Sequence, residues 1–250
     1  MQYHIKLSDD IGAKYAIIPG DPGRVEKIAA YLDDAKQIMC NREYNSYLGY
    51  LSGEKVLVVS TGIGGPSCAI CVEELAKIGV ETFIRVGTCG GMQEDVAPGD
   101  VVIATGAVRM EGTSREYMPI EFPAVADFDV TNALSAAAEK LGYKKHIGVV
   151  QAKDSFYGQH SPETMPVSSE LLYKWDAWKK GGCLASEMES AALFIISSIR
   201  RLRSGAVFHC VWNQEVSKSA MPENRKEDTA CAIKTAVEAL RIIIEKDRSK

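Results

Sequence analysis

Two arginines lie near the ends of expected strands and helices, where α/β proteins often bind anions. Arg24 lies in the glycine-rich turn PGDPGRV, and Arg85 interrupts the apolar run of IRVGTCGG. A guanidinium that leaves water needs an anionic partner, and backbone amides at a helix start favour an anion. Taken alone, Arg24 is equally well explained as a surface residue. Arg85, taken alone, is equally well explained by an ion pair with a carboxylate of the protein. Together, with Gly20 and the Thr88 hydroxyl beside them in sequence, they favour a bound phosphate or sulfate.

A pair of carboxylates follows in the segment ASEMESAAL. Glu187 and Glu189 are two residues apart, so they share a face if this segment is the end of a strand and diverge if it is a helix. The helical alternative makes them the acidic first turn of a helix that runs on through Ile195. On a strand end, with Met188 between them, a carboxylate can accept both hydrogen bonds of a vicinal diol such as that of a ribose.

The segment SFYGQHS sets two aromatic rings beside an amide, an imidazole and hydroxyls. We expect it to be a loop in which Phe156 and Tyr157 sandwich a flat ring, while Gln159 both donates and accepts a hydrogen bond. Asn213 and Gln214 add amides from the end of another expected strand. Amides and aromatic rings together suit a nucleobase. The alternative for Phe156 is packing in the core.

Motifs of other chemistries are absent from the sequence. It has no P-loop, GxSxG or HExxH pattern, and its four histidines are dispersed without metal-ligand spacing. The glycine-rich turn STGIGGPS is explained by a change of chain direction alone. Cys68 and Cys71 form a CxxC within an expected helix, so two small buried side chains are a better interpretation than a redox or zinc site.

These segments alternate with runs that predict strands and helices. Apolar, β-branched runs bounded by glycine predict strands covered on both faces, and they are KYAIIPG, KVLVVSTG, TFIRVGTCGG, DVVIATGAV, HIGVVQA and GAVFHCVW. A helix is expected from Pro22 with Asp21 as its N-cap, and the apolar stripe from Ala230 to Ile244 predicts a C-terminal helix. The alternation indicates one α/β domain over residues 1–250, with ligands at the carboxyl ends of its strands.

Size and charge exclude some classes of function. The 250 residues carry a net charge of −4 and are 46% hydrophobic and 25% charged. This balance disfavours a constitutive nucleic-acid or acidic-membrane surface, so we expect neither partner. No run reaches the roughly 18–20 apolar residues of a membrane helix, and the N-terminus lacks a signal-peptide pattern. The cytoplasm is therefore the expected compartment, and the seven scattered cysteines are typical of reduced thiols.

Several of these segments, with others between them, resemble the uridine phosphorylases of the nucleoside phosphorylase family, the trimeric and hexameric type. The matching segments span almost the whole chain in the family's order: GDPGRVEKIA, NREY, STGIGGPS, RVGTCGG, EFPAVADF, SFYGQ and SEMESAAL. The resemblance implies a three-layer α/β/α sandwich around a central mixed sheet that curls toward a barrel. It also implies dimers assembled into a homohexamer with shared active sites.

The activity that the resemblance implies is that of a pentosyltransferase, a glycosyltransferase of nucleotide salvage and pyrimidine metabolism. Uridine and phosphate would be converted reversibly to uracil and ribose 1-phosphate, with small molecules as the partners and no cofactor. Cleavage of the N-glycosidic bond passes through an oxocarbenium-like ribosyl group, which the bound phosphate stabilises and then attacks. The protein would act by positioning and electrostatics, so it needs no nucleophile of its own.

Residue roles carry over by motif. Phosphate would be bound by Gly20, Arg24, Arg85 and Thr88, and by Arg42 of NREY from the neighbouring subunit. Ribose would be held by Met188, Glu189 and Thr88, with His4 reaching the 5′-hydroxyl across the dimer interface. The base would meet Phe156, Gln159, Glu187 and Val211. The catalytic residues would be Arg85, Glu189 and Gln159, the last stabilising charge on the departing base. A monovalent cation, K⁺, would lie between subunits at Glu43, Ile63 and Ser67.

The base-binding residues depart from the family pattern. Ser161 and Gln214 stand where these enzymes usually have arginines that meet the uracil carbonyl edge, and His160 or Gln214 are candidates to replace them. Asn213 stands where purine-specific relatives place an aspartate that protonates the base, and an amide cannot donate that proton. Three alternatives stay open: a phosphorylase of broader or altered base specificity, a hydrolytic nucleosidase, and a non-catalytic nucleoside-binding or phosphate-binding protein. The three arginines argue against the nucleosidase, because water as nucleophile needs no anion site.

Overall fold

The computed structural model of the chain describes residues 1–216 and 228–249. Its strands, in chain order, are β1 (Tyr15–Pro19), β2 (Asp33–Asn41), β3 (Tyr44–Leu51), β4 (Glu54–Val59), β5 (Thr82–Gly91), β6 (Val101–Met110), β7 (Ala124–Val125), β8 (Lys145–Lys153), β9 (Ala185–Glu187) and β10 (Arg203–Asn213). Its helices are α1 (Gly23–Ala29), α2 (Gly65–Lys77), α3 (Thr113–Tyr117), α4 (Phe128–Lys140), α5 (Phe156–His160), α6 (Ser168–Lys180), α7 (Ser190–Arg200) and α8 (Ala230–Arg248), with a 3₁₀ turn at Pro162–Thr164.

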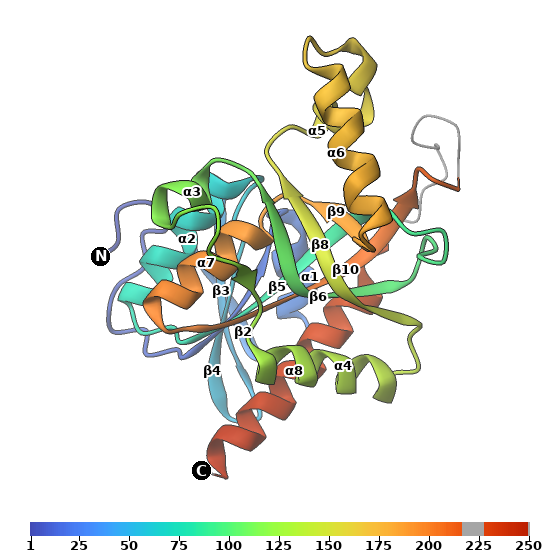
Figure 1. Cartoon of the computed structure of the whole chain (residues 1–250). Helices are drawn as coiled ribbons and strands as arrows, with labels where there is room; N and C mark the ends of the chain where they lie inside the picture. Colours follow the sequence, from blue (N-terminus) through green and yellow to red (C-terminus); the bar gives the residue numbers. More distant parts are fainter. Residues whose placement is uncertain (217–227, 250) are drawn as a thin grey trace.

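The described strands form one mixed sheet that closes on itself at one end (Figure 1). Its order is β10-β6-β8-β9-β5-β1-β4-β3-β2, with β7 paired to β6. Because β10 also pairs with β5, the five strands β10, β6, β8, β9 and β5 complete a barrel. The sheet contains parallel pairs such as β1–β5 and β8–β9 and antiparallel pairs such as β5–β9 and β6–β10. The sequence prediction of a mixed sheet that curls toward a barrel is confirmed.

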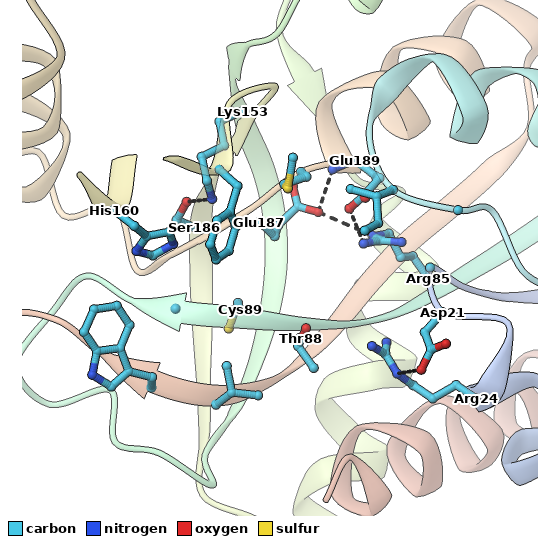
Figure 2. A pocket seen from close by; sticks show the side chains of 18 of the residues that line it. Asp21, Arg24, Arg85, Thr88, Cys89, Lys153, His160, Ser186, Glu187 and Glu189 are labelled. Carbon is cyan, nitrogen blue, oxygen red and sulfur yellow. Dashed lines mark hydrogen bonds and ion pairs between the residues drawn. The ribbon is translucent and has the colours of Figure 1, made fainter. Parts of the chain in front are cut away.

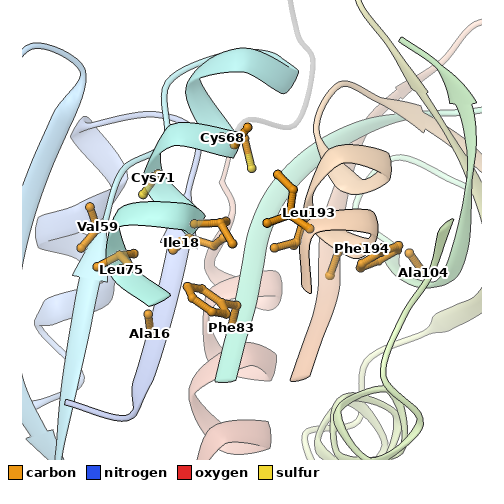
Figure 3. Close-up of a cluster of buried hydrophobic side chains, with 14 of the residues drawn as sticks. Ala16, Ile18, Val59, Cys68, Cys71, Leu75, Phe83, Ala104, Leu193 and Phe194 are labelled. Atoms are coloured by element: carbon orange, nitrogen blue, oxygen red, sulfur yellow. The ribbon is translucent and has the colours of Figure 1, made fainter. Parts of the chain in front are cut away.

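Helices cover both faces of the sheet and give the three layers. On one face, α2 and α7 pack against each other, and α7 also packs on β6, β7 and β10. Cys68, Leu75, Phe83, Leu193 and Phe194 are all fully buried there (Figure 3). On the other face, α1, α4 and α8 bury their own apolar side chains, among them Ile28, Leu134 and Leu240. Both cysteines of the CxxC are buried in α2, as the structural interpretation predicts.

The structure confirms the strands predicted from the apolar runs, but it corrects the predicted start of the first helix. All six predicted strand segments are found as β1, β4, β5, β6, β8 and β10, and the C-terminal stripe lies on α8. The expected N-cap role of Asp21 is wrong: α1 begins at Gly23 after Pro22. The Asp21 side chain accepts from the Gly23 amide at 2.9 Å, so it closes the turn one residue before the helix.

The segment SFYGQHS is a short helix and not a loop. Ser155 caps α5 by accepting from the Gly158 amide at 2.9 Å. After the 3₁₀ turn, α6 follows without a single fully buried residue, and in Figure 1 α5 and α6 stand away from the body of the sheet. No helix in the described ranges has both the length and the apolar character needed to cross a membrane.

Candidate functional site

A cavity of about 630 Å³ opens where β1, β5, β8, β9 and β10 end. This is the edge of the sheet at which α/β folds bind ligands. Most of the predicted site residues line it: Gly20, Arg24, Glu43, Ile63, Arg85, Thr88, Phe156, Glu187, Met188, Glu189 and Val211. Figure 2 shows Arg24, Arg85 and Thr88 toward one end of the cavity and Lys153, Ser186 and His160 toward the other.

Arg85 is the buried cation of the first end. Its side chain comes from the middle of β5, and the residue is 4% exposed. Nε donates to Glu187 Oε2 at 3.4 Å, and Nη2 is paired with Glu189 Oε2. Nη1 is buried and has no hydrogen-bond partner among the described residues. Since a buried donor without a partner costs free energy, this nitrogen marks a position for an anionic ligand.

The environment keeps Arg85 charged. Burial acts to lower the pKa of its guanidinium, but the Glu189 and Glu187 carboxylates outweigh burial and hold that pKa above its ordinary value. The protein-carboxylate interpretation of Arg85 is met at two of its nitrogens, and the oxyanion interpretation stays a prediction. Protein carboxylates bind two of its nitrogens, and the third faces Gly20, where an added Cβ would lie 3.7 Å from Nη1.

Arg24 adds a second cation at the same end. It lies in the first turn of α1, where Nη1 donates to the Val86 carbonyl at 3.3 Å and Nε lies 3.9 Å from Asp21 Oδ2. Its side chain is mostly shielded from solvent. Thr88 lies three residues after Arg85 on β5 and also lines the cavity. The glycine turn and β5 thus bring two guanidinium groups and a hydroxyl together.

The two glutamates converge on Arg85 because the chain is extended up to Glu187 and then turns into α7. Glu187 ends β9, and Glu189 is the residue immediately before the helix. Glu187 accepts from the amides of Glu189 and Ser190, both at 2.9 Å, while Glu189 Oε1 accepts from the Gly64 amide at 2.7 Å. Burial raises the pKa of Glu187, opposed by the Arg85 charge. The strand-end interpretation is met by Glu187, whereas Glu189 lies beyond the strand at the start of α7.

Lys153 is the charged residue that sequence reasoning missed. It ends β8, is 4% exposed, and lines the cavity. Its Nζ donates to Ser186 Oγ at 2.7 Å (Figure 2). Burial lowers the pKa of Lys153 to about 8, against the Glu187 charge that raises it. The available signal was a lysine directly after the expected strand HIGVVQA and two residues after Gln151, because both side chains share one face if the strand continues to Lys153.

An aromatic and imidazole cluster forms the wall beside Lys153. The rings of Phe156 and His160 lie 4.2 Å apart between centroids, and those of His160 and Trp212 lie 5.6 Å apart. His160 Nδ1 is buried without a described partner. Burial, followed by the Lys153 charge, lowers the pKa of His160 to about 4, so its imidazole is neutral at pH 7. Of the two predicted substitutes for the missing arginines, His160 lines this cavity and Gln214 does not.

Gln159 lies one hydrogen bond behind the cavity wall. Its carboxamide oxygen is 2.6 Å from Ser186 Oγ, and its side chain lines a neighbouring cavity of about 150 Å³ under α6. Asn213 also turns away, since its Nδ2 donates to the carbonyls of Gln93 and Val96 at 2.7 and 2.9 Å. Tyr157 is 70% exposed and lines neither cavity, so the expected sandwich with Phe156 is not formed in this chain.

Two predicted residues lie away from the cavity of their own chain. Arg42 is exposed at the tip of the β2–β3 hairpin with a φ of 54°. His4 Nδ1 lies 2.7 Å from Glu74 Oε1, and the same carboxylate accepts from the backbone amides of His4 and Ile5. Neither residue lines the cavity. Their roles in a neighbouring subunit stay predictions.

The three residues predicted to hold a monovalent cation lie together. Ser67 Oγ donates to the Ile63 carbonyl at 3.2 Å. An added Cβ on Gly62 would lie 2.9 Å from Glu43 Cγ and 3.1 Å from Ser67 Oγ, which brings a carboxylate, a carbonyl and a hydroxyl to one place. No cluster of three or more histidine, cysteine or acidic residues suited to a metal occurs within residues 1–216 and 228–249.

The charges around the cavity are nearly balanced. Arg24, Arg85 and Lys153 face four carboxylates along its wall, those of Asp21, Glu43, Glu187 and Glu189. An anion bound by one chain alone would therefore meet no net positive charge from these side chains. One end offers an anion site, the middle offers a carboxylate for hydroxyl groups, and the far end offers an ammonium and aromatic rings.

Comparison with known proteins gives full-length matches. A family model described as "Phosphorylase superfamily" matches residues 14–245. The chain is 56% identical to a uridine phosphorylase of Treponema pallidum (strain Nichols), over 98% of this chain and 95% of the relative. It is 43% identical to the uridine phosphorylase of Klebsiella aerogenes, over 97% and 98%. It is also 39% identical to a guanosine phosphorylase of Halorubrum lacusprofundi, over 96% and 98%.

Proposed function

The chain belongs to the phosphorylase superfamily, and on this premise we propose that it catalyses the reversible phosphorolysis of uridine to uracil and ribose 1-phosphate. It is then a pentosyltransferase that acts on an N-glycosidic bond. The observation that carries the proposal is one cavity in which an unpartnered arginine nitrogen, a buried carboxylate and a buried lysine lie in sequence along the wall. Nucleoside and phosphate are the reactants, and the reaction calls for no cofactor.

Phosphate is proposed to bind at the arginine end. Arg85 Nη1 supplies a buried donor that no described protein group uses, and Arg24, Thr88 and the backbone at Gly20 complete the chain's own contribution. Because the carboxylates of the wall offset these cations, a further positive charge is needed to hold a dianion. Arg42 at the exposed hairpin tip of a neighbouring subunit is suited to supply it, which supports shared active sites in a dimer.

Ribose is proposed to lie against Glu189 and Met188. Glu189 Oε1 and Oε2 are already oriented by the Gly64 amide and by Arg85, so the carboxylate is held rigidly next to the phosphate site. A preorganised acceptor can hold the sugar hydroxyls while positive charge develops on the ribosyl group, and its own negative charge stabilises that state. His4 of a neighbouring subunit would reach the 5′-hydroxyl.

The base is proposed to lie at the far end, against Phe156 and Val211. Departure of uracil leaves negative charge on its ring, and Lys153 Nζ is the buried cation placed to meet it. We therefore assign to Lys153 the charge stabilisation that the usual arginine pair of this family would give. His160, as a neutral imidazole, offers a hydrogen bond beside it. Gln159 and Glu187 are less directly placed, since each is engaged by protein partners.

A purine substrate is the second candidate, because one relative is named a guanosine phosphorylase. The position of Asn213 argues against it as the main substrate. The amide nitrogen of Asn213 is committed to two backbone carbonyls, and an amide cannot donate a proton to a purine ring. Uridine is therefore preferred, with broader base choice as the alternative.

Assembly and ion binding complete the proposal. Dimers that form a hexamer would bring Arg42 and His4 to neighbouring cavities. The carboxylate of Glu43, the carbonyl of Ile63 and the hydroxyl of Ser67 are hard oxygen donors of the kind that alkali and alkaline-earth cations prefer, so these residues fit a K⁺ ion between subunits. Such an ion would only position the loops that carry these groups.

The direct experiment is an assay of uridine with inorganic phosphate. Uracil release is followed by ultraviolet absorbance, and ribose 1-phosphate is identified by ³¹P NMR. The proposal predicts the two products in equal amounts, and ribose as the product instead would assign the chain to hydrolytic nucleosidases.

A further inference from the structure

Ser186 lies between the buried ammonium and two carboxamides. It is the middle residue of β9, is 3% exposed, and lines the main cavity. Lys153 Nζ donates to Ser186 Oγ at 2.7 Å (Figure 2). The same Oγ is 2.6 Å from Gln159 Oε1 and is also hydrogen-bonded to Gln151 Oε1. In the described structure, Ser186 Oγ is the one hydrogen-bond acceptor of Lys153 Nζ.

The hydrogen-bonding capacity of these groups fixes the direction of the serine hydroxyl. A hydroxyl has one proton and two lone pairs, and a carboxamide oxygen only accepts. Gln151 keeps its oxygen toward Ser186 because its nitrogen donates to Met110 Sδ at 3.1 Å, and a thioether sulfur has no proton to give. The Ser186 proton is therefore committed to a carboxamide oxygen, and its lone pairs remain for Lys153.

A hydroxyl held in this way can accept from an ammonium but cannot donate to a neutral amine. We propose that Ser186 is a positioning residue that holds Lys153 in its protonated form and aims it at the base end of the cavity. The proposal rests on the proposed function, in which the Lys153 ammonium meets the departing base. Loss of the hydroxyl would leave Lys153 without a direct acceptor, so its neutral form and other rotamers would become more populated.

Other groups around Lys153 act on it less directly. Glu187 of β9 and Glu189 before α7 favour its charged form, as does Cys89 of β5, but both carboxylates are hydrogen-bonded to Arg85. His160 of α5 faces Lys153 and is neutral at pH 7, because burial lowers its pKa to about 4. Burial opposes the charge on Lys153. Lys153 Nζ donates its direct hydrogen bond to Ser186 Oγ, so removal of this acceptor should lower the proton affinity of Lys153.

The test is the pH dependence of uridine turnover in Ser186→Ala, with Ser186→Thr as the conservative rescue. A hydrogen bond to a charged group is worth about one to two pH units of proton affinity. We expect the alkaline limb of kcat to move about one unit lower in Ser186→Ala, which makes kcat at pH 8 about fivefold lower than in the wild type. KM for phosphate should stay unchanged, and Ser186→Thr should return the limb to its wild-type position.

Ser197→Ala is the matched control. Ser197 is 2% exposed within α7, and its hydroxyl has no hydrogen-bond partner among the described residues, so the variant deletes a buried hydroxyl that does not touch Lys153. Its pH profile should equal that of the wild type. A Ser186→Ala profile lowered by one factor at every pH, with the alkaline limb unmoved, would show a merely structural role and overturn the proposal.

A titration without turnover separates this proposal from the proposed function. NMR of ¹³C-lysine-labelled protein, with the Lys153 signal identified by its loss in Lys153→Met, reports the pKa of Lys153 directly. A pKa about one unit lower in Ser186→Ala than in the wild type supports the proposal even in a chain that releases no uracil. Equal pKa values in the two proteins overturn it even if uridine phosphorolysis is confirmed.

Discussion

Arg85 and Glu189 form a buried ion pair at the cavity wall that leaves the second terminal nitrogen of Arg85 free of protein partners in the described structure. The carboxylate thus fixes the position of the guanidinium but leaves one of its nitrogens available as a hydrogen-bond donor. This relationship places the proposed ribose acceptor and the proposed phosphate donor on the same two side chains, so the nucleophile and the sugar are positioned together.

Replacing Arg85 should nearly abolish phosphorolysis. In Arg85→Ala, kcat/KM for uridine is expected to fall by at least about 100-fold, because a preorganised charged donor to the reacting anion is lost. Arg85→Lys keeps the charge but not the forked geometry, and it should recover only part of this loss. Steady-state kinetics at several phosphate concentrations measures the effect, with thermal unfolding as the control for folding. Activity within a few-fold of the wild type would remove Arg85 from the site.

Lys153 should give the reaction an alkaline limit. Burial lowers the pKa of Lys153 to about 8, so the ammonium proposed to meet the departing base is lost as the pH rises through this value. The kcat for uridine should fall above about pH 8 in the wild type. In Lys153→Met it should be low and flat over the same range. An unchanged alkaline limb in Lys153→Met would assign the limb to another group.

The same lysine should lower the stability of the folded chain at neutral pH. Its folded pKa of about 8 lies below the ordinary value of 10.5, so between these values the unfolded chain binds a proton that the folded chain has released. The free energy of unfolding should therefore rise with pH across this window. Lys153→Met removes the buried charge, and denaturant unfolding at pH 7 should show a gain of about 1–3 kcal/mol. A loss of stability would contradict this reasoning.

Arg42 should act in the active site of a neighbouring subunit. Arg42→Ala and Arg85→Ala should each be nearly inactive alone, because each lacks one cation for phosphate. After subunit exchange, half of randomly mixed dimers contain one of each, and one of their two sites is intact, so the mixture should recover about a quarter of wild-type activity. The assay compares mixed and separate samples of equal concentration. No recovery after demonstrated exchange would place both arginines in one subunit's site.

The sequence predicted the parts of the site that rest on backbone pattern. Apolar runs located the strands, and Arg85 was visible because a charge inside such a run needs a partner. Lys153 was missed because it is the last residue of β8 and reads equally well as the exposed start of a turn. Its burial depends on β9, three residues long, whose pairing to β5 and β8 no local pattern indicates.

The sequence also could not predict the direction of a side chain whose hydrogen-bond partners are distant in the chain. Gln159 and Asn213 were both assigned to a base edge from their amide chemistry, yet Ser186 holds one and the carbonyls of Gln93 and Val96 hold the other. These partners lie 27, 120 and 117 residues away in the chain. The start of α1 was misplaced for a local reason, because Asp21 caps the preceding turn.

Uridine turnover with and without inorganic phosphate tests the central claim most directly. A panel of uridine, thymidine, cytidine, inosine and adenosine is assayed under both conditions, with the released base and the sugar product measured. The account predicts that uracil is released from uridine in the presence of phosphate, with ribose 1-phosphate as the second product, and that release stops when phosphate is removed. Uracil release that proceeds equally well without phosphate, or no release under either condition, would contradict it.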